Sequence, residues 1–178
     1  PVITSLNCGS VSYSAIATEN TSYNATATVN YSGGNGIAYT SGVSIASTGV
    51  SGLTATLQAG TLANGNGSLT YTISGTPVSA GTAIFDLSFG GQSCSISLTV
   101  NTFQPSITSL NCGMVSYNAT ATANTAYNGT ATVSYNGGNG AAYTTGSSIA
   151  STGVTGLTAS LQAGTLVNGN GNLSYTIS

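Results

Sequence analysis

Apolar and polar residues alternate with a period of two in several segments of the chain. In residues 21–31 every second position from Tyr23 to Tyr31 is apolar or aromatic, and Asn or Thr stands between them. This period is that of a β-strand with one buried face, and no segment shows a sustained helical period. The pattern therefore predicts strands over residues 21–31, 53–59, 69–73, 83–89 and 93–100.

Glycine-rich runs bound these predicted strands. Such runs are typical of turns, and they occupy Gly33–Gly36, Asn64–Gly67, Gly75–Pro77 and Gly90–Gly91. A phosphate-binding glycine loop would be followed by a helix, whereas a predicted strand follows the first two runs, so we interpret them as turns. About seven to nine short strands in roughly 100 residues predict an all-β fold, an antiparallel β-sandwich.

The chain contains an internal repeat with an offset of 104 residues. Residues 1–74 align with residues 105–178 without a gap, and 57 of the 74 positions are identical. This period has the size of one small domain, so we expect repeat 1 at 1–104 and repeat 2 at 105–178. The C-terminal third of repeat 2 is absent from this chain. We expect a longer tandem array, and the alternative is that a neighbouring molecule supplies the missing strands.

Charge is almost absent from this sequence. The 178 residues include no Lys, Arg or His, and the only acids are Glu19 and Asp86, which gives a net charge of −2. Without cations the chain cannot neutralise phosphates, so we expect no nucleic-acid partner. Without histidine it lacks the usual base of nucleophilic catalysis and the usual zinc ligands. We therefore expect no enzyme, no catalytic residue, no cofactor and no metal, and we interpret Asp86 as a solvated residue rather than a calcium ligand.

The cysteines suggest a disulfide within repeat 1. Cys8 lies near its start and Cys94 near its end, while Cys112 is the copy of Cys8, whose partner would lie outside the chain. A Cys8–Cys94 bridge would stabilise the domain by roughly 4–5 kcal/mol and would indicate an oxidising, extracellular or periplasmic compartment. Pairing of Cys94 with Cys112 and free or intermolecular thiols are the alternatives. No apolar run of 18 residues occurs, so we expect no membrane insertion in this segment.

A set of short motifs resembles a known bacterial family. Leu69-Thr-Tyr-Thr-Ile-Ser-Gly-Thr-Pro77, Ala80-Gly-Thr82, Phe85 and Leu98-Thr-Val100 together resemble bacterial immunoglobulin-like repeats. The whole unit looks like the tandem repeats of large secreted or surface proteins of Bacteroidota of the Flavobacterium type. The resemblance implies an immunoglobulin-like fold, export by the type IX pathway and an adhesin-like role on the cell surface or in an extracellular filament.

Two functional hypotheses follow, and both involve the tyrosines. All five tyrosines of repeat 1 recur in repeat 2. Packing in the core would explain them, but tyrosine also forms contact surfaces at low entropic cost. The candidate contact residues are Tyr31, Tyr39, Tyr135 and Tyr143. The first hypothesis is a structural repeat that associates with copies of itself, and the second is a module that binds a surface glycan through end loops.

Pairs of threonines in Thr-x-Thr spacing raise a further possibility, ice binding. The pairs are Thr26/Thr28, Thr54/Thr56 and Thr70/Thr72. An ice-binding face needs such pairs at a short and strict spacing, and a period of 104 residues does not supply it. We therefore do not expect ice binding.

Overall fold

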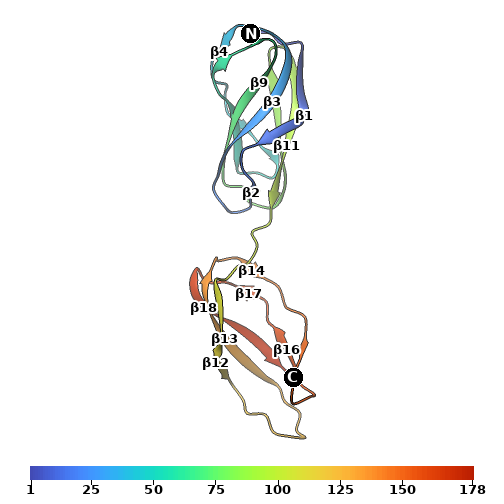
Figure 1. Cartoon of the computed structure of the whole chain (residues 1–178), viewed down its shortest axis with the longest axis vertical. Coiled ribbons are helices and arrows are strands. Elements are labelled where there is room, and N and C mark those ends of the chain that lie inside the picture. The colour runs from blue at the N-terminus through green and yellow to red at the C-terminus, as the bar shows by residue number, and fades with distance from the viewer. The chain divides into compact units, whose positions relative to one another are not determined.

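The computed structural model describes all residues, 1–178, and divides into two compact units. Unit 1 comprises Pro1–Phe103 and unit 2 comprises Gln104–Ser178, one residue from the boundary that the repeat predicts. Both units are built from strands (Figure 1), which confirms the predicted all-β class. The structure contains no helix with the length and apolar character needed to cross a membrane.

The larger sheet of unit 1 has five antiparallel strands. Its spatial order is β1 (Ser5–Tyr13), β3 (Tyr23–Asn35), β9 (Asn64–Gly75), β7 (Leu53–Leu57) and β5 (Ile45–Ala46). Buried residues alternate with more exposed ones along β3 and β7, as the sequence pattern predicts. The pleat places every second side chain on the same face, so each strand contributes one apolar face to the interior.

A second sheet of unit 1 has four strands in the order β2 (Ala17–Thr18), β11 (Gln92–Asn101), β10 (Gly81–Phe89) and β6 (Thr48–Gly49). β10 and β11 form an antiparallel hairpin through a turn at Gly90–Gly91. β2 runs parallel to β11, the single exception to antiparallel pairing. A separate pair joins β4 (Ala38–Tyr39) to β8 (Gly60–Thr61).

The core of unit 1 combines side chains from both sheets. Leu69 and Ile73 of β9 belong to the same buried cluster as Phe85 of β10 and Ile96 of β11. The cluster contains no buried polar or charged residue. Burial of apolar area from both sheets is thus the main force that holds them together.

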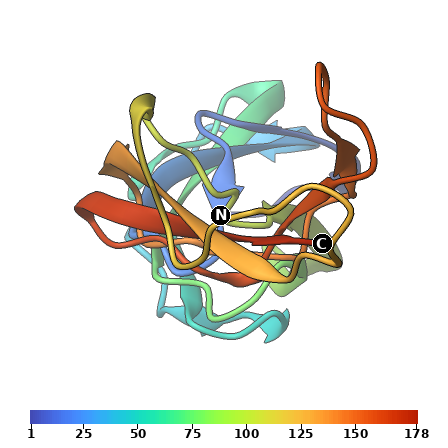
Figure 2. The ribbon, with the colours of Figure 1, turned by 90° about the horizontal axis from the view of Figure 1, so that it is seen from below.

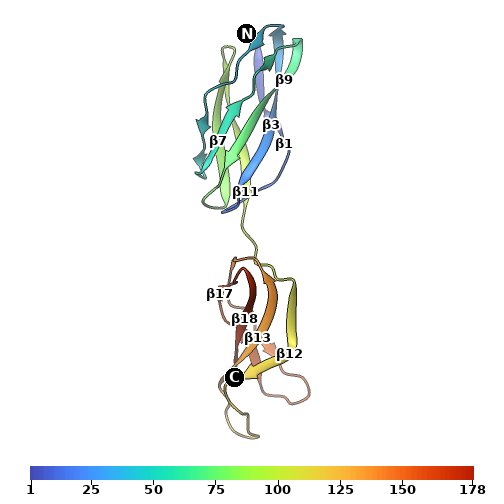
Figure 3. The same ribbon diagram turned by 90° about the vertical axis from the view of Figure 1, so that its left-hand side faces the viewer.

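Unit 2 repeats the larger sheet of unit 1 but has no counterpart of the four-stranded sheet. Its five strands lie in the order β12 (Ser109–Tyr117), β13 (Gly129–Gly138), β18 (Gly169–Ile177), β16 (Thr158–Leu161) and β15 (Ile149–Ala150). β14 (Ala142–Tyr143) and β17 (Gly164–Thr165) form a small pair. Figure 3 shows β18, β13 and β12 side by side, and the orange β13 and red β18 are seen from below in Figure 2.

Two of the predicted turns are wrong. Gly33 to Asn35 lie at the end of β3, and Asn64 to Gly67 begin β9. The two ends pair with each other around an irregularity between Tyr31 and Gly34. A Cβ at Gly67 would collide with the hydroxyl of Tyr31, so this glycine makes room for a ring rather than for a turn.

Candidate functional site

A disulfide joins the two sheets of unit 1. Cys8 of β1 is bonded to Cys94 of β11, and their Cα atoms are 6.0 Å apart. This confirms the expected pairing within repeat 1 and excludes the pairing of Cys94 with Cys112. The bond spans 86 residues of sequence, so it ties the first long strand to the last one. Cys112 is a free, exposed thiol.

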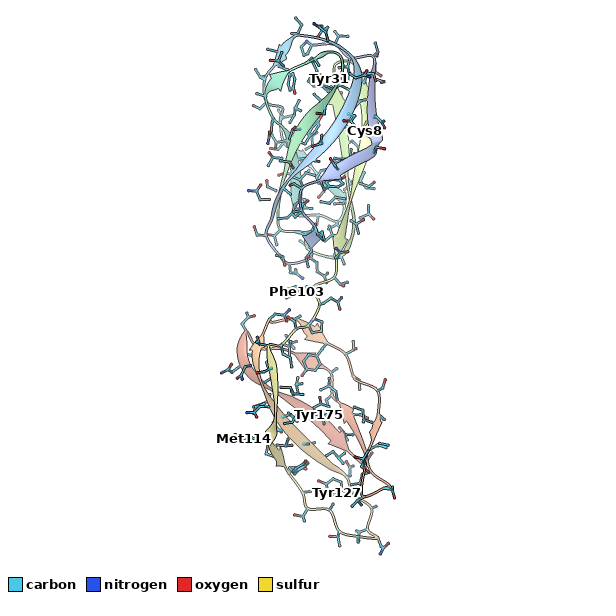
Figure 4. All side chains as sticks on the ribbon, in the orientation of Figure 1. Cys8, Tyr31, Phe103, Met114, Tyr127 and Tyr175 are labelled. Atoms are coloured by element: carbon cyan, nitrogen blue, oxygen red, sulfur yellow. A yellow bond between two sulfur atoms is a disulfide. The ribbon has the colours of Figure 1, made fainter.

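The structure buries two of the four candidate contact tyrosines. Tyr31 is only 4% exposed, and its hydroxyl accepts a hydrogen bond of 2.7 Å from the Ala63 backbone N–H. Tyr135 is likewise buried and accepts an identical 2.7 Å bond from the Val167 N–H. Neither residue can belong to an exposed contact surface, which corrects the expectation for both. Figure 4 labels Tyr31 within unit 1.

These two tyrosines were misassigned because alternation shows only that a residue faces inward. It does not show whether a phenol hydroxyl reaches water or an internal donor. Here each hydroxyl meets a backbone N–H that lies 32 residues further along the chain. A buried tyrosine usually finds such a partner, which allows the whole ring to be buried.

Tyr39 and Tyr143 remain available for contact. Both are half-buried and occupy the same place in β4 and β14. The Tyr39 ring packs edge to face against Phe89, with ring centroids 5.0 Å apart. Phe89 belongs to β10, and unit 2 has no counterpart of this strand. Of the candidate contact tyrosines, each unit therefore presents one that is partly exposed, at an equivalent position.

Two other tyrosines of unit 1 have strongly perturbed acidity. Burial raises the pKa of Tyr13 to about 12, and Tyr23 adds to the shift. Burial also raises the pKa of Tyr71 to about 12, with a smaller effect of Tyr39. The Tyr13 hydroxyl donates to the Ser97 carbonyl at 2.7 Å. The Tyr71 hydroxyl is buried without a hydrogen-bond partner. Both phenols stay protonated at neutral pH, so Tyr13 contributes packing and a hydrogen bond, and Tyr71 contributes packing.

The acids have structural partners in unit 1. The Glu19 carboxylate accepts hydrogen bonds from the backbone N–H groups of Ala80, at 2.7 Å, and Phe103, at 3.1 Å. Asp86 is exposed and accepts a 2.6 Å bond from the Ser95 hydroxyl on the neighbouring strand. No group of three or more His, Cys, Asp or Glu side chains comes together in the structure. No local sequence pattern indicates this role of Glu19, because its partners are 61 and 84 residues away along the chain.

The Thr-x-Thr pairs come together on three adjacent strands. Thr26 of β3 lies opposite Thr72 of β9, and Thr72 lies opposite Thr56 of β7. We call the outward side of these strands the threonine face; its six threonines are Thr26, Thr28, Thr54, Thr56, Thr70 and Thr72. All six are half-exposed. The pairing of neighbouring strands sets the spacing of these threonines. The period of 104 residues, on which the expectation of no ice binding depends, is therefore not the relevant spacing on this face.

Hydrogen bonds between side chains order the threonine face. The Gln58 amide donates to the Thr72 hydroxyl at 2.8 Å, and the hydroxyls of Ser44 and Thr56 are 2.9 Å apart. The corresponding sheet of unit 2 has the same Gln–Thr contact at 2.8 Å. The face carries hydroxyls and amides but no charge, so another surface can cover it without desolvating an ion.

Comparison with protein-family models, with curated proteins and with solved structures gave no match to this chain. The residues and their geometry are therefore the basis for a functional assignment.

Proposed function

We propose that this chain is a non-enzymatic structural repeat of an extracellular bacterial filament or giant surface adhesin. In this proposal each repeat is an immunoglobulin-like β-sandwich that gives reach and mechanical strength and associates with copies of itself. The observation that carries the proposal is an almost uncharged β-unit that recurs with 57 of 74 aligned positions identical, and whose first copy is locked by a disulfide.

The charge pattern supports self-association. The net charge of −2 over 178 residues gives almost no long-range repulsion between copies. The threonine face offers an uncharged surface across three strands, and both units have a sheet of this kind. Hydroxyl-bearing sheets can exchange hydrogen bonds with water for hydrogen bonds with each other at small net cost.

The disulfide supports an extracellular role. Disulfides persist in oxidising compartments, which fits a cell-surface or secreted protein. Under tension applied along the chain, Cys8–Cys94 would keep β1 and β11 joined, because it is a covalent bond between two strands that belong to different sheets. Such a bond would make a domain in the shaft of a filament more resistant to being pulled out.

Analytical ultracentrifugation tests the self-association. We expect the apparent mass to rise with concentration and to change little between low and high salt, because few charges are available for screening. The double variant Thr26→Lys/Thr72→Lys, which charges the centre of the threonine face, should shift the protein to monomer. Ser88→Lys/Ser93→Lys adds the same charge at exposed positions of the other sheet and serves as the control. A wild-type chain that stays monomeric at every concentration refutes this part of the proposal.

A second candidate function is recognition of a surface glycan through the end loops. The observation in its favour is the partly exposed tyrosine at the same position of each unit, Tyr39 and Tyr143. A glycan array probes it directly: saturable binding that is lost in Tyr39→Ala/Tyr143→Ala would support this function. Absence of binding to any glycan would leave the structural function as the better account.

A further inference from the structure

Eight asparagines of this chain are followed directly by a glycine, three in unit 1 and five in unit 2. In such an Asn–Gly dipeptide the backbone nitrogen of the glycine can attack the side-chain amide carbon of the asparagine, because no glycine side chain stands in the way. The attack requires rotation of the backbone, which glycine permits more readily than other residues. Whether a given dipeptide reacts therefore depends on how firmly the fold holds it.

The glycine is packed against a neighbouring side chain in six of the eight dipeptides. A Cβ on Gly67 would collide with the hydroxyl of Tyr31, and a Cβ on its copy Gly171 would collide with the hydroxyl of Tyr135. Neighbours this close restrict rotation of the glycine backbone toward the preceding asparagine. The other four glycines at which a Cβ would collide with a side chain are Gly36, Gly129, Gly137 and Gly140.

Hydrogen bonds hold some of these dipeptides through the asparagine as well. The Asn139 side-chain oxygen accepts from the backbone N–H groups of Ser106 and Ala141, each at 3.2 Å. Its amide nitrogen donates to the Gln104 carbonyl at 2.8 Å. The Asn35 side-chain oxygen accepts from the Val2 N–H at 3.3 Å. An amide in such bonds can turn toward the glycine nitrogen only after the bonds break.

The two remaining dipeptides, Asn64–Gly65 and Asn168–Gly169, differ in both respects. Apart from the chain neighbours, no atom lies within 4 Å of the place that a Cβ would take on either glycine. Both asparagines are exposed, and neither side chain makes a hydrogen bond with the protein. The two dipeptides occupy equivalent positions of the repeat, so the same local structure occurs twice.

Strand pairing is also limited at these two places. In unit 1 the ladder of β3 and β9 is interrupted after Tyr31↔Gly67, and only Gly34↔Gly65 and Asn35↔Asn64 follow. In unit 2 a single pair, Gly138↔Gly169, follows the corresponding interruption. The end of a ladder opens at a lower free energy than its centre, because few contacts are lost. Figure 1 labels β9 and β18, and the two dipeptides lie where these strands begin.

We propose that the fold selects Asn64 and Asn168 as sites of spontaneous deamidation. The nitrogen of the following glycine loses its proton and attacks the side-chain amide carbon. A bond forms between these two atoms, the bond from that carbon to the side-chain nitrogen breaks, and ammonia leaves with the proton. Water then opens the resulting five-membered succinimide at either carbonyl, which yields aspartate or isoaspartate. The net reaction consumes one water, releases one ammonia and transfers no electron.

Deamidation would make the charge of the molecule a record of its age. Each event adds one carboxylate to a chain whose net charge is only −2, so two events double the net negative charge. An isoaspartate also adds a carbon atom to the backbone, which disturbs the pairing of Gly65 or Gly169 with the neighbouring strand. The inference goes beyond the proposed structural function and does not depend on it, because it requires only a folded chain in water.

Timed incubation of the whole folded chain in neutral buffer tests the proposal. The chain has no Lys or Arg, so it is digested with a protease that cleaves after leucine. The resulting peptides 63–69 and 167–173 each contain two Asn–Gly dipeptides, and fragmentation in a mass spectrometer assigns the new acid to one of them. The rate should rise with pH, because the attacking nitrogen must lose its proton.

The expected result is a strong preference within each of these peptides. Asn64 should convert at least about tenfold faster than Asn66, which corresponds to about 1.4 kcal/mol in the free energy of local opening. Asn168 should exceed Asn170 by the same factor, because Gly171 is packed against Tyr135 as Gly67 is against Tyr31. In urea, where no fold restrains the dipeptides, all eight should convert at similar rates.

Two double variants provide a matched control. Asn64→Gln/Asn168→Gln lengthens both side chains by one methylene, so that attack by the glycine nitrogen would have to close a larger ring. This variant should lose most of the early ammonia release of the folded chain. Asn66→Gln/Asn170→Gln makes the same change at the neighbouring exposed positions and should leave the early release unchanged.

Three results would overturn the proposal. The folded chain could keep all eight asparagines while the chain in urea loses them, which would mean that the fold protects every dipeptide. Asn66 and Asn170 could convert as fast as Asn64 and Asn168 in the folded chain. The preference for Asn64 and Asn168 could persist in urea, which would mean that the fold does not select them. The measurement identifies single residues, so its result is independent of whether the chain associates with itself.

Discussion

Removal of the disulfide in unit 1 should destabilise that unit strongly. The perturbation is the double substitution Cys8→Ala/Cys94→Ala, which removes both partners so that neither is left as an unpaired thiol. The bond closes a loop of 86 residues between strands of different sheets. In the unfolded chain the bond holds together two residues that are 86 positions apart, which lowers the conformational entropy of the unfolded state. Without the bond the unfolded state has a higher entropy, so unfolding becomes more favourable.

The expected loss is large relative to the total stability. The chain-entropy relation gives about 4–5 kcal/mol for a loop of this length. Domains of this size have a free energy of unfolding of about 5–15 kcal/mol, so the loss removes roughly a quarter or more of it. Each kcal/mol corresponds to roughly 4–8 °C in a domain of about 100 residues, so the melting temperature should fall by about 20 °C or more.

Urea and thermal unfolding of the whole chain, followed by circular dichroism, measure this effect. Cys112→Ala is the matched control, because that thiol is exposed and unpaired, and it should change stability by less than about 0.5 kcal/mol. Reduction of the wild-type protein should reproduce the double variant. A loss below about 1 kcal/mol in the double variant would refute the entropic argument.

Three further predictions follow from the structure. Val50→Ala should destabilise unit 1 by about 2 kcal/mol, whereas the equivalent Val154→Ala should cost less than about 0.5 kcal/mol, as measured by urea unfolding. Tyr31→Phe should cost about 1–3 kcal/mol, because the Ala63 N–H loses its acceptor, and the same unfolding assay measures it. Unit 1 should lose stability as pH rises from about 10 to about 12, because Tyr13 and Tyr71 have raised pKa values, and their protonated forms stabilise the folded state only below that window.

Each of these three predictions has an outcome that contradicts it. Equal effects of the two valine substitutions would mean that Val154 is as well covered as Val50. An unchanged stability of Tyr31→Phe would mean that water replaces the lost hydroxyl. Constant unfolding midpoints between pH 10 and pH 12, with the Tyr13 and Tyr71 phenols already half ionised at about pH 10, would show that the two phenols are not buried.

The sequence alone was enough to predict the all-β class, the two units and the disulfide partners. Alternation with a period of two is a local property, and it places strands at β3, β7, β9, β10 and β11 without knowledge of their neighbours. The offset of 104 residues locates the second unit directly. Cys8 and Cys94 occur together in repeat 1, which makes their pairing the simplest expectation.

Tertiary structure alone decided which side chains are accessible. Tyr31 and Tyr39 look alike in the sequence, yet only Tyr31 meets a backbone donor that allows complete burial. The carboxylate of Glu19 meets N–H groups 61 and 84 residues away, a distance that no local pattern encodes. Such contacts depend on how strands are ordered in space, which alternation does not specify.

The two units show this division most directly. Leu53 and Leu157 occupy equivalent positions in repeats that share 57 of 74 residues, and one is buried while the other is half-buried. The sequence determines that both side chains are apolar and belong to the same side of the alternating pattern, although Leu53 begins β7 and Leu157 lies just before β16. Whether that side becomes a core depends on a hairpin distant along the chain, because burial is a property of the assembled sheets and not of a single strand.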